Sequence, residues 1–232
     1  MVKKPVMIIT GTSKGIGRYL AEYYIENGFQ VVGCSRGIID YELENYQHFT
    51  LDISDESAVK IMFAYIRKRY GRLDVLINNA GIASKSYVLL SSLEDLHGSL
   101  NSNFVGTFLF CRESAKLMKT NNFGRIVTLS SIHVTLAMEG TAIYGASKGA
   151  IEQFSKVFAK EVFQFGINVN TLSLSIVKNT GMENILTDDI KHKILSQTVS
   201  KEELSMHDVT KSINYLIDEE NKMVTDQILC LG

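Results

Sequence analysis

Short runs of β-branched and other apolar residues alternate along the chain with longer segments in which apolar positions recur every three or four residues. The runs predict strands, and the longer segments predict amphipathic helices. Several runs are apolar almost throughout, as strands covered on both faces must be. The predicted strands are Val6–Thr10, Gln30–Cys34, His48–Leu51, Leu73–Ile77, Arg125–Leu129, Ile167–Leu172 and Gln227–Leu231. The predicted helices lie near residues 16–27, 55–70, 94–119, 143–165 and 207–218.

The regular succession of strand, helix and strand predicts right-handed crossover connections and one parallel sheet. Gly28, Gly71 and Gly166 stand just past three of the predicted helices, where a helix end best tolerates a left-handed residue. We therefore expect a single doubly wound α/β domain of the Rossmann type over residues 1–232, with about seven strands and helices on both faces.

Residues 178–206 break this alternation after the sixth predicted strand. In such folds ligands bind beyond the carboxyl ends of the strands. A loose segment at this place is therefore predicted to form a lid over a substrate site. A surface excursion without a role is the alternative.

Composition narrows the class of protein. The chain is 45% hydrophobic and 21% charged, which is typical of a soluble globular protein. Its 24 basic and 25 acidic residues give a net charge of -1, which offers no field for gathering nucleic acid or an anionic membrane. The three cysteines, Cys34, Cys111 and Cys230, are widely spaced, so we expect free thiols in a reducing, cytoplasmic compartment and no metal site.

A glycine-rich turn joins the first predicted strand to the first helix. It reads Thr10-Gly11-Thr12-Ser13-Lys14-Gly15-Ile16-Gly17. Glycines there allow backbone N–H groups and the start of the helix to approach a pyrophosphate. An ordinary loop is the alternative, but the place between a strand and a helix favours a dinucleotide. The residues expected to bind it are Gly11, Ser13, Lys14, Gly15, Ile16 and Gly17.

The end of the second predicted strand bears on which dinucleotide binds. A site for NAD places an acidic residue there to accept a hydrogen bond from the ribose 2′-hydroxyl. Here Ser35 and Arg36 follow the strand, and the first acidic residue afterwards is Asp40. Arg36 and Lys14 are suited to charge-assisted hydrogen bonds with a 2′-phosphate. We therefore expect NADP(H) as the cofactor, with two solvated surface cations as the alternative.

Tyr144 and Lys148 lie one turn apart on a predicted helix, thirteen residues after Ser131. A free tyrosine with a pKa near 10 is a poor proton donor, and lowering that pKa toward 7 takes on the order of 4 kcal/mol. A neighbouring ammonium, together with the positive ring of a cofactor, is able to supply it. By itself this spacing most often marks a solvated pair on a helix.

Four motifs occur together and in order along the chain. They are the turn from Thr10 to Gly17, Asn78-Asn79-Ala80-Gly81 after the fourth predicted strand, Asn103 within Asn101-Ser102-Asn103-Phe104-Val105-Gly106, and Ser131 followed by Tyr144-x-x-x-Lys148. On these motifs the sequence from Met7 to Gly232 resembles the short-chain dehydrogenase/reductase family. The resemblance is to its short single-domain branch, and most to the 3-oxoacyl-(acyl-carrier-protein) reductases.

The resemblance implies a role for each of four catalytic residues. Tyr144 would protonate the carbonyl oxygen of the substrate, and Lys148 would lower the pKa of Tyr144 and hold the nicotinamide ribose. Ser131 would orient the carbonyl group, and Asn103 would anchor a water molecule that relays protons. The further cofactor contacts that it implies are Asp52 and Ile53 near the adenine, Asn79, Ala80 and Gly81 near the ribose, and Val177 and Thr180 near the carboxamide and phosphate.

One motif of the family is absent. The family usually has Pro-Gly after the sixth strand, where this chain reads Ser173-Leu174-Ser175-Ile176-Val177. This difference puts in question the path of the backbone after the sixth strand and the hinge of the predicted lid. His133, two residues after Ser131, is a candidate pocket residue, with a structural role as the alternative.

The resemblance implies an NADPH-dependent carbonyl reductase that acts on a small ketone, with a 3-oxoacyl thioester favoured. One alternative is an oxidoreductase of another alcohol–ketone pair, such as a polyketide, a sugar or a small metabolite. Another is a catalytically silent sensor or scaffold that binds NADP. The family also implies a homodimer or homotetramer, with packing inside the monomer as the competing explanation for the apolar stripe on one helix. That stripe consists of Phe104, Phe108, Phe110 and Leu117.

Overall fold

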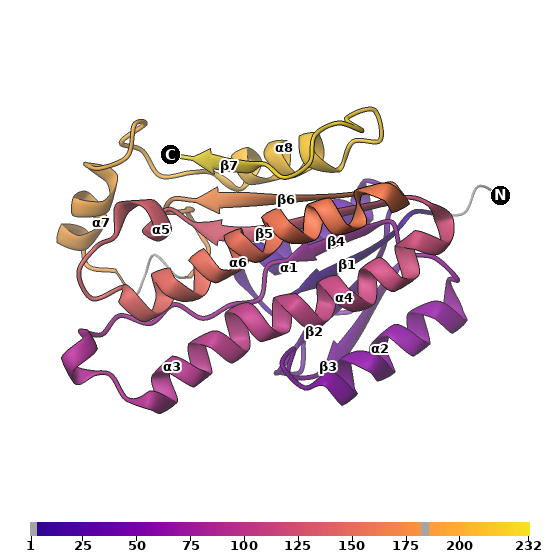
Figure 1. Ribbon diagram of the computed structural model, residues 1–232, viewed down its shortest axis with the longest axis horizontal. Helices are drawn as coiled ribbons and strands as arrows, with labels where there is room; N and C mark the ends of the chain where they lie inside the picture. The colour runs from indigo at the N-terminus through magenta and orange to yellow at the C-terminus, as the bar shows by residue number, and fades with distance from the viewer. Residues whose placement is uncertain (1–3, 182–185) are drawn as a thin grey trace.

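The computed structural model describes residues 4–181 and 186–232. Seven strands form one sheet in the order β3-β2-β1-β4-β5-β6-β7, and every neighbouring pair is parallel (Figure 1). The strands are β1 (Val6–Thr10), β2 (Gln30–Ser35), β3 (Tyr46–Thr50), β4 (Val75–Asn78), β5 (Gly124–Ser131), β6 (Ile167–Leu174) and β7 (Ile228–Leu231). The predicted doubly wound α/β fold of the Rossmann type is confirmed.

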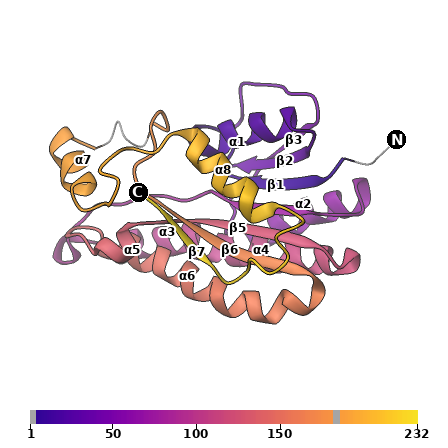
Figure 2. The same cartoon turned by 90° about the horizontal axis from the view of Figure 1, so that it is seen from above.

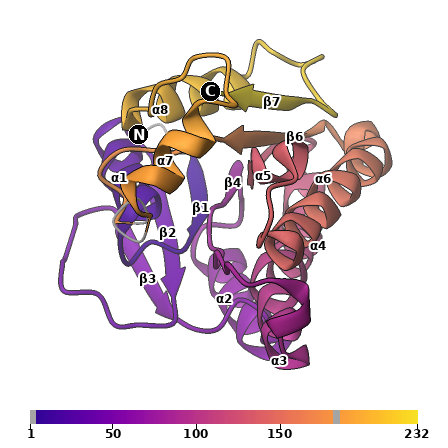
Figure 3. The ribbon, with the colours of Figure 1, turned by 90° about the vertical axis from the view of Figure 1, so that its left-hand side faces the viewer.

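Helices cover both faces of the sheet (Figure 3). One face carries α1 (Gly15–Glu26) and α8 (Met206–Ile217), and the other carries α2 (Glu56–Arg69), α4 (Gly106–Met118) and α6 (Ala142–Val162). Alternate residues of β1 pack against the helices on opposite faces of the sheet. Met7 and Ile9 pack toward α1 and α8, whereas Ile8 packs toward α2, α4 and α6. This two-sided burial explains why the strands appear as continuous apolar runs in the sequence.

The carboxyl ends of the strands form the functional edge of the sheet. β1 pairs with β2 on one side and with β4 on the other, so the direction of winding reverses at β1. Beyond these strand ends lie α5 (His133–Leu136) and α7 (Asp188–Leu195), at the opposite end of the molecule from the N-terminus (Figures 1 and 2). Ligands of doubly wound folds bind at this reversal point.

The helix expected near residues 94–119 is divided in the structure. It consists of α3 (Leu93–Leu100), a π-helical turn (Asn101–Val105) and α4. The turn brings Asn103 against the loop after β4, where its side chain bonds to the backbone of Ile82. Single π-helical turns of this kind are frequent at functional sites.

The local sequence pattern predicted the helix ends correctly but misplaced the bounds of the edge strand. Gly28, Gly71 and Gly166 have φ angles of 89°, 71° and 70°, as predicted for helix C-caps. The third strand is shifted by one to two residues from the predicted His48–Leu51. It lies at the edge of the sheet and is only half-buried, so its apolar signal is weak.

An isolated β-bridge outside the sheet closes the base of the predicted lid. Val177 forms a parallel bridge with Leu204, and the backbone N–H of Leu204 donates to the carbonyl of Ile176 at 2.8 Å. Between them the chain forms α7, whose Ile194 packs against Ile132 and Ile176. Residues 182–185 of this predicted segment lie outside the described residues. Within the part of the chain that the structure describes, no helix is long and apolar enough to cross a bilayer.

The strand end without Pro-Gly keeps a regular path. β6 runs on to Leu174, and the backbone N–H of Ser175 donates to the carbonyl of Leu231 in β7 at 3.1 Å. An added Cβ at the neighbouring Gly232 would lie 2.5 Å from the Cβ of Ser175, so this corner is closely packed. Hydrogen bonds to the last strand thus hold the backbone that the absent proline turn put in question.

Candidate active site

A cavity of about 510 Å³ lies at the carboxyl ends of the strands. It is lined by the glycine-rich turn, by the loops after β2, β3, β4 and β5, and by the start of the predicted lid. All predicted site residues line it except Gly17 and Asn103. Those that line it are Gly11, Ser13, Lys14, Gly15, Ile16, Arg36, Asp52, Ile53, Asn79, Ala80, Gly81, Ser131, Tyr144, Lys148, Val177 and Thr180.

The glycine-rich turn is packed so closely that side chains would not fit. Gly11 has a φ of +76°, and a Cβ added there would lie 2.9 Å from the Cα of Ala80. A Cβ at Gly17 would collide with the carbonyl oxygen of Gly11, which explains why Gly17 is a packing residue outside the cavity wall. The side chain of Asn79 donates to the carbonyl oxygens of Thr10 at 2.8 Å and Gly11 at 3.2 Å. The turn is thereby locked to the end of β4.

Two cations stand at the opposite end of the cavity from the tyrosine. Lys14 precedes α1 as its N-cap residue, and Arg36 is exposed just after β2. Among the described residues, no carboxylate forms an ion pair with either of them. Both cations line the cavity, where an anionic ligand can reach them. Together with the glycine cradle, this donor set fits the phosphates of a dinucleotide.

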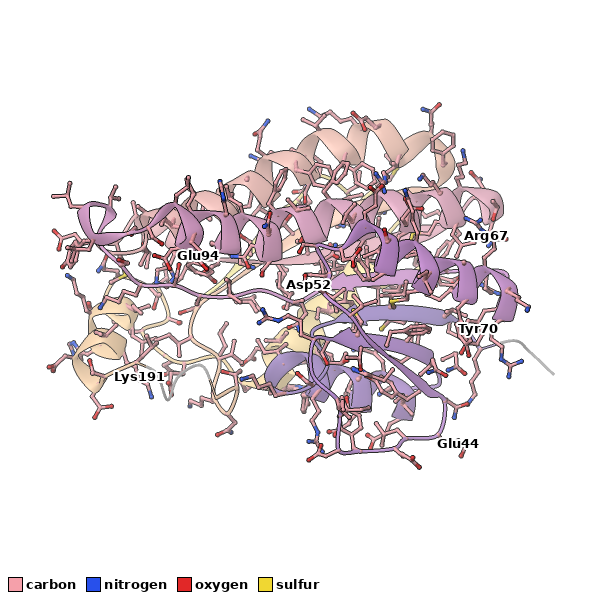
Figure 4. The ribbon with its side chains drawn as sticks, turned by 90° about the horizontal axis from the view of Figure 1, so that it is seen from below. Glu44, Asp52, Arg67, Tyr70, Glu94 and Lys191 are labelled. Carbon is pink, nitrogen blue, oxygen red and sulfur yellow. The ribbon has the colours of Figure 1, made fainter. Side chains whose placement is uncertain are left out.

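Asp52 lies in the loop after β3. In Figure 4 its label stands between those of Lys191 in α7 and Arg67 near the end of α2. Its carboxylate accepts hydrogen bonds from the backbone N–H and the hydroxyl of Ser54, at 2.8 and 2.7 Å. Burial works to raise the pKa of Asp52, but these hydrogen bonds and the charge of Arg36 outweigh it and hold the pKa below its usual value. Asp52 thus lines the cavity as a carboxylate whose hydrogen bonds to Ser54 stabilise the loop after β3.

Tyr144 and Lys148 face the same cavity from one side of α6. The ammonium of Lys148 donates to the carbonyl of Leu129 at 2.8 Å and lies 6.0 Å from the centre of the Tyr144 ring. Burial lowers the pKa of Lys148 to about 8, and the negative charge of Glu152 opposes that change. Burial also raises the pKa of Tyr144, while its hydrogen bond with Ser131 acts in the other direction. The site therefore holds a phenol beside a lysine whose charge is poorly solvated.

His133 contacts two of the predicted catalytic residues. Its Nδ1 lies 3.0 Å from the Ser131 hydroxyl, and its backbone N–H donates to the same oxygen at 3.3 Å. The rings of His133 and Tyr144 meet edge to face, with centroids 5.6 Å apart. Burial lowers the pKa of His133. The candidate pocket histidine thus lies on the cavity wall and holds the Ser131 hydroxyl in place.

Asn103 is fully buried behind the cavity wall. Its Oδ1 accepts from the backbone N–H of Ile82 at 2.8 Å, and its Nδ2 donates to the carbonyl of Ile82 at 3.0 Å and to the hydroxyl of Ser147 at 2.8 Å. These bonds tie the loop after β4 to α6. The structure therefore does not bring the side chain of Asn103 to the cavity with Ser131, Tyr144 and Lys148.

Part of the cavity wall is apolar and comes from the predicted lid. Leu186 and Ile194 of the predicted lid join Ile132 and Ile176 there, above the end of β6. The sequence predicted a lid over residues 178–206 but did not single out these apolar residues. Thr141, at the start of α6, also lines the cavity. The cavity wall thus combines this apolar patch with the two cations.

Comparison with known proteins identifies the family. The model of the family described as "short chain dehydrogenase" matches residues 5–191. The chain belongs to this family. Membership in the short-chain dehydrogenases makes it an oxidoreductase that acts on alcohol and carbonyl groups, which confirms the prediction of an enzyme.

Several short-chain dehydrogenases resemble the chain over nearly its whole length. The 3-oxoacyl-[acyl-carrier-protein] reductase FabG of Salmonella typhimurium is 28% identical over 230 residues, which are 97% of this chain and 94% of that protein. The solved structure "ElxO with NADP Bound" has a TM-score of 0.88 and 29% identity, covering 98% of this chain and 97% of that one. "4-hydroxyisoleucine dehydrogenase complexed with NADH" has a TM-score of 0.87 and 25% identity, covering 98% and 96%. The NADP in the first structure agrees with the predicted cofactor.

Proposed function

We propose that this short-chain dehydrogenase is an NADPH-dependent carbonyl reductase. The observation that carries the proposal is that one cavity is lined by Ser131, Tyr144 and Lys148 at one end and by Lys14 and Arg36 at the other. The first end supplies a proton donor and a carbonyl-orienting hydroxyl, and the second end supplies charges for a phosphate. NADPH, when bound, would supply the hydride that reduces the carbonyl carbon.

Each residue at the tyrosine end has one task in this proposal. Tyr144 donates its phenolic proton to the carbonyl oxygen, which becomes the hydroxyl of the product. Ser131 orients that oxygen through a hydrogen bond, with its own hydroxyl held by His133. Lys148 stabilises the phenolate left behind on Tyr144 and holds the ribose next to the nicotinamide. Asn103 acts from behind the wall by fixing the loop after β4 against α6.

The remaining predicted residues are proposed as cofactor contacts. The glycine-rich turn would hold the pyrophosphate, Asn79, Ala80 and Gly81 the ribose, and Val177 and Thr180 the carboxamide and phosphate. Lys14 and Arg36 would face the 2′-phosphate, where each charge-assisted bond contributes roughly 1.5–3 kcal/mol. We therefore propose that NADPH is preferred over NADH by at least about tenfold, the ratio that corresponds to roughly 1.4 kcal/mol.

A double variant tests the cofactor proposal. Ser35→Asp combined with Arg36→Ala adds a carboxylate that repels the 2′-phosphate and removes a cation that attracts it. We expect the ratio of kcat/KM for NADPH to that for NADH to fall or reverse on one accepted ketone. Equal use of NADH by the unaltered enzyme would show that Lys14 and Arg36 are surface charges and that the pattern of the NADH-bound relative applies instead.

A 3-oxoacyl thioester is the favoured substrate. The support is the likeness to the 3-oxoacyl reductase of Salmonella typhimurium and the apolar wall that Ile132, Leu186 and Ile194 build in the cavity that Tyr144 also lines. The test is the oxidation of NADPH in the presence of acyl thioesters, polyketides, sugars and simple ketones. Turnover confined to sugars would assign a different alcohol–ketone pair. Absence of turnover with every ketone, while NADPH still binds, would favour a silent sensor or scaffold.

We also propose that the protein assembles through α4 and α6. Phe104 of the π-helical turn and Phe108 of α4 meet Phe154 of α6 with ring centroids 6.0 and 5.9 Å apart. Phe108 is 37% exposed and Val157 of α6 is 48% exposed, so an apolar surface continues from this cluster to solvent. Light scattering should report a dimer or tetramer, and a monomer at working concentration would restrict the cluster to packing inside one chain.

A further inference from the structure

A network of hydroxyl groups surrounds one imidazole behind the cation end of the cavity. His48 of β3 has its Nε2 3.1 Å from the hydroxyl of Ser35, the last residue of β2 and part of the cavity wall. Its Nδ1 lies 2.9 Å from the hydroxyl of Tyr46 and 3.5 Å from that of Thr12, in the glycine-rich turn. His48 itself does not line the cavity, so it acts on the cavity only through these neighbours.

The proton positions in this network follow from its geometry. The Ser35 hydroxyl donates to the carbonyl of Gly37 at 2.8 Å. A hydroxyl has one proton, so the Ser35 oxygen accepts at Nε2 and the ring is the donor there. At Nδ1 the Tyr46 hydroxyl is free to donate to a neutral ring. It is also placed to turn its proton to Thr12 Oγ1, 2.7 Å away, and then to accept from a charged ring. Both charge states of His48 are therefore fully hydrogen-bonded.

The surroundings of His48 hold few charges. From β2 the buried thiol of Cys34 faces the network, and from β3 the phenol of Tyr46 does. Tyr41 donates to the carbonyl of Thr12 at 2.7 Å, and its far side is covered by Arg18 of α1, which pairs with Asp40 at 3.5 Å. Burial lowers the pKa of His48, with a hydrogen bond to Gly37 opposing it. Burial therefore disfavours the charged form of the ring when no anion is nearby.

We propose that His48 is a specificity-determining positioning residue that holds Ser35 in place and takes up a proton when a 2′-phosphate binds at Lys14 and Arg36. The inference rests on the proposed NADP site. Ser35 lies between the ring and the cavity, so a dianionic phosphate there would favour the charged ring across one hydroxyl group. The charged ring would in turn strengthen binding of a ligand that carries the 2′-phosphate and leave a ligand without it unaffected.

Binding linkage makes the proposal measurable. If one proton is taken up, the affinity for the 2′-phosphate ligand relative to the ligand without it rises as the pH falls, by at most about tenfold per pH unit. The phosphate itself titrates near pH 6 and weakens its own binding on protonation. That second effect is the same for every variant of the protein. The difference between variants therefore isolates the contribution of His48.

The experiment is calorimetric titration with adenosine 2′,5′-bisphosphate and with adenosine 5′-monophosphate, between pH 6 and pH 8. Each titration is run in two buffers of different ionisation enthalpy, which gives the number of protons taken up. The protein is the unaltered chain, His48→Gln, and His48→Phe. Glutamine keeps an N–H donor for Ser35 but gains no proton, whereas phenylalanine removes both functions. Arg36→Ala is the control that weakens the phosphate site without altering the imidazole.

We expect the unaltered protein to take up more protons with the bisphosphate than His48→Gln does, and its preference for the bisphosphate to rise at least about threefold more between pH 8 and pH 6. His48→Phe should lose part of the preference at every pH while still binding the monophosphate, which shows that the site is folded. Equal proton uptake by the unaltered protein and His48→Gln, with the preference intact, would overturn this inference alone. Absence of any preference in the unaltered protein would overturn the proposed NADP site together with it.

Discussion

Replacing Lys148 with methionine should make the protein more stable and, at the same time, inactive. The side chain is buried, and its pKa is lowered from 10.5 to about 8 by burial. Each pKa unit corresponds to about 1.4 kcal/mol, so the folded state carries a penalty of about 3 kcal/mol while the lysine is charged. Methionine removes that charge, and it also removes the hydrogen bond to the carbonyl of Leu129, which contributes about 1 kcal/mol. We expect a net gain of about 2 kcal/mol at pH 7.

The sign of the pH dependence follows from the lowered pKa. Between pH 8 and pH 10.5 the unfolded chain keeps the proton on Lys148 and the folded chain loses it. The unfolded state therefore binds more protons in this window, and the stability of the unaltered protein rises with pH there. The Lys148→Met variant lacks this rise. Its advantage should be full at pH 7 and should disappear as the pH approaches 10.

Urea unfolding at several pH values measures both effects, and thermal unfolding should show the gain as an increase of about 4–8 °C in Tm at pH 7. Lys156→Met is the matched control, because Lys156 lies on the same helix and is exposed. It should change the stability little at any pH. A Lys148→Met variant that is less stable than the unaltered protein at pH 7, or a difference that does not change with pH, would refute the reasoning.

Three further variants test the site and the core. Tyr144→Phe should lower the rate of ketone reduction by about 10²–10⁴-fold and leave the Kd for NADPH unchanged, since it removes only the proton donor. Glu152→Gln removes the charge that opposes the lowering of the Lys148 pKa, so the upper limb of the pH–rate profile should move below about pH 8; an unmoved limb would separate Glu152 from the reaction. Phe110 is fully buried against Phe63, and Phe110→Ala should cost about 3–5 kcal/mol in urea unfolding.

The fold was predictable because most strands are covered on both faces. The neighbours Ile8 and Ile9 pack against helices on opposite faces of the sheet. The run that contains them is therefore apolar throughout and easy to recognise. β3 is an edge strand that pairs only with β2 and stays half-exposed. Its predicted bounds therefore differ by one to two residues from the observed ones. The π-helical turn at Asn103 depends on hydrogen bonds to Ile82 in another segment, and helical periodicity contains no sign of it.

The candidate site was predictable wherever its residues stand at a fixed spacing on one element. Tyr144 and Lys148 share a helix face, and the glycine-rich turn is contiguous, so their shared cavity could be expected. The contact between His48 and Ser35 joins two strands whose register the sequence leaves open. The pKa of Lys148 is lowered by burial among several segments of the fold. The spacing of residues along one helix cannot predict that burial.

The bridge between Val177 and Leu204 separates the segment that carries α7 from the rest of the fold. The bridge pairs the chain just after β6 with the chain just before α8, so the segment between Val177 and Leu204 is closed at its base. Lengthening such a closed loop is inexpensive, at about 0.6 kcal/mol for each doubling of its length. Insertions and substitutions within this segment can therefore reshape the wall formed by Leu186 and Ile194 while β6 and the glycine-rich turn stay in register. The shape of this apolar part of the cavity can thus change without a change in the sheet.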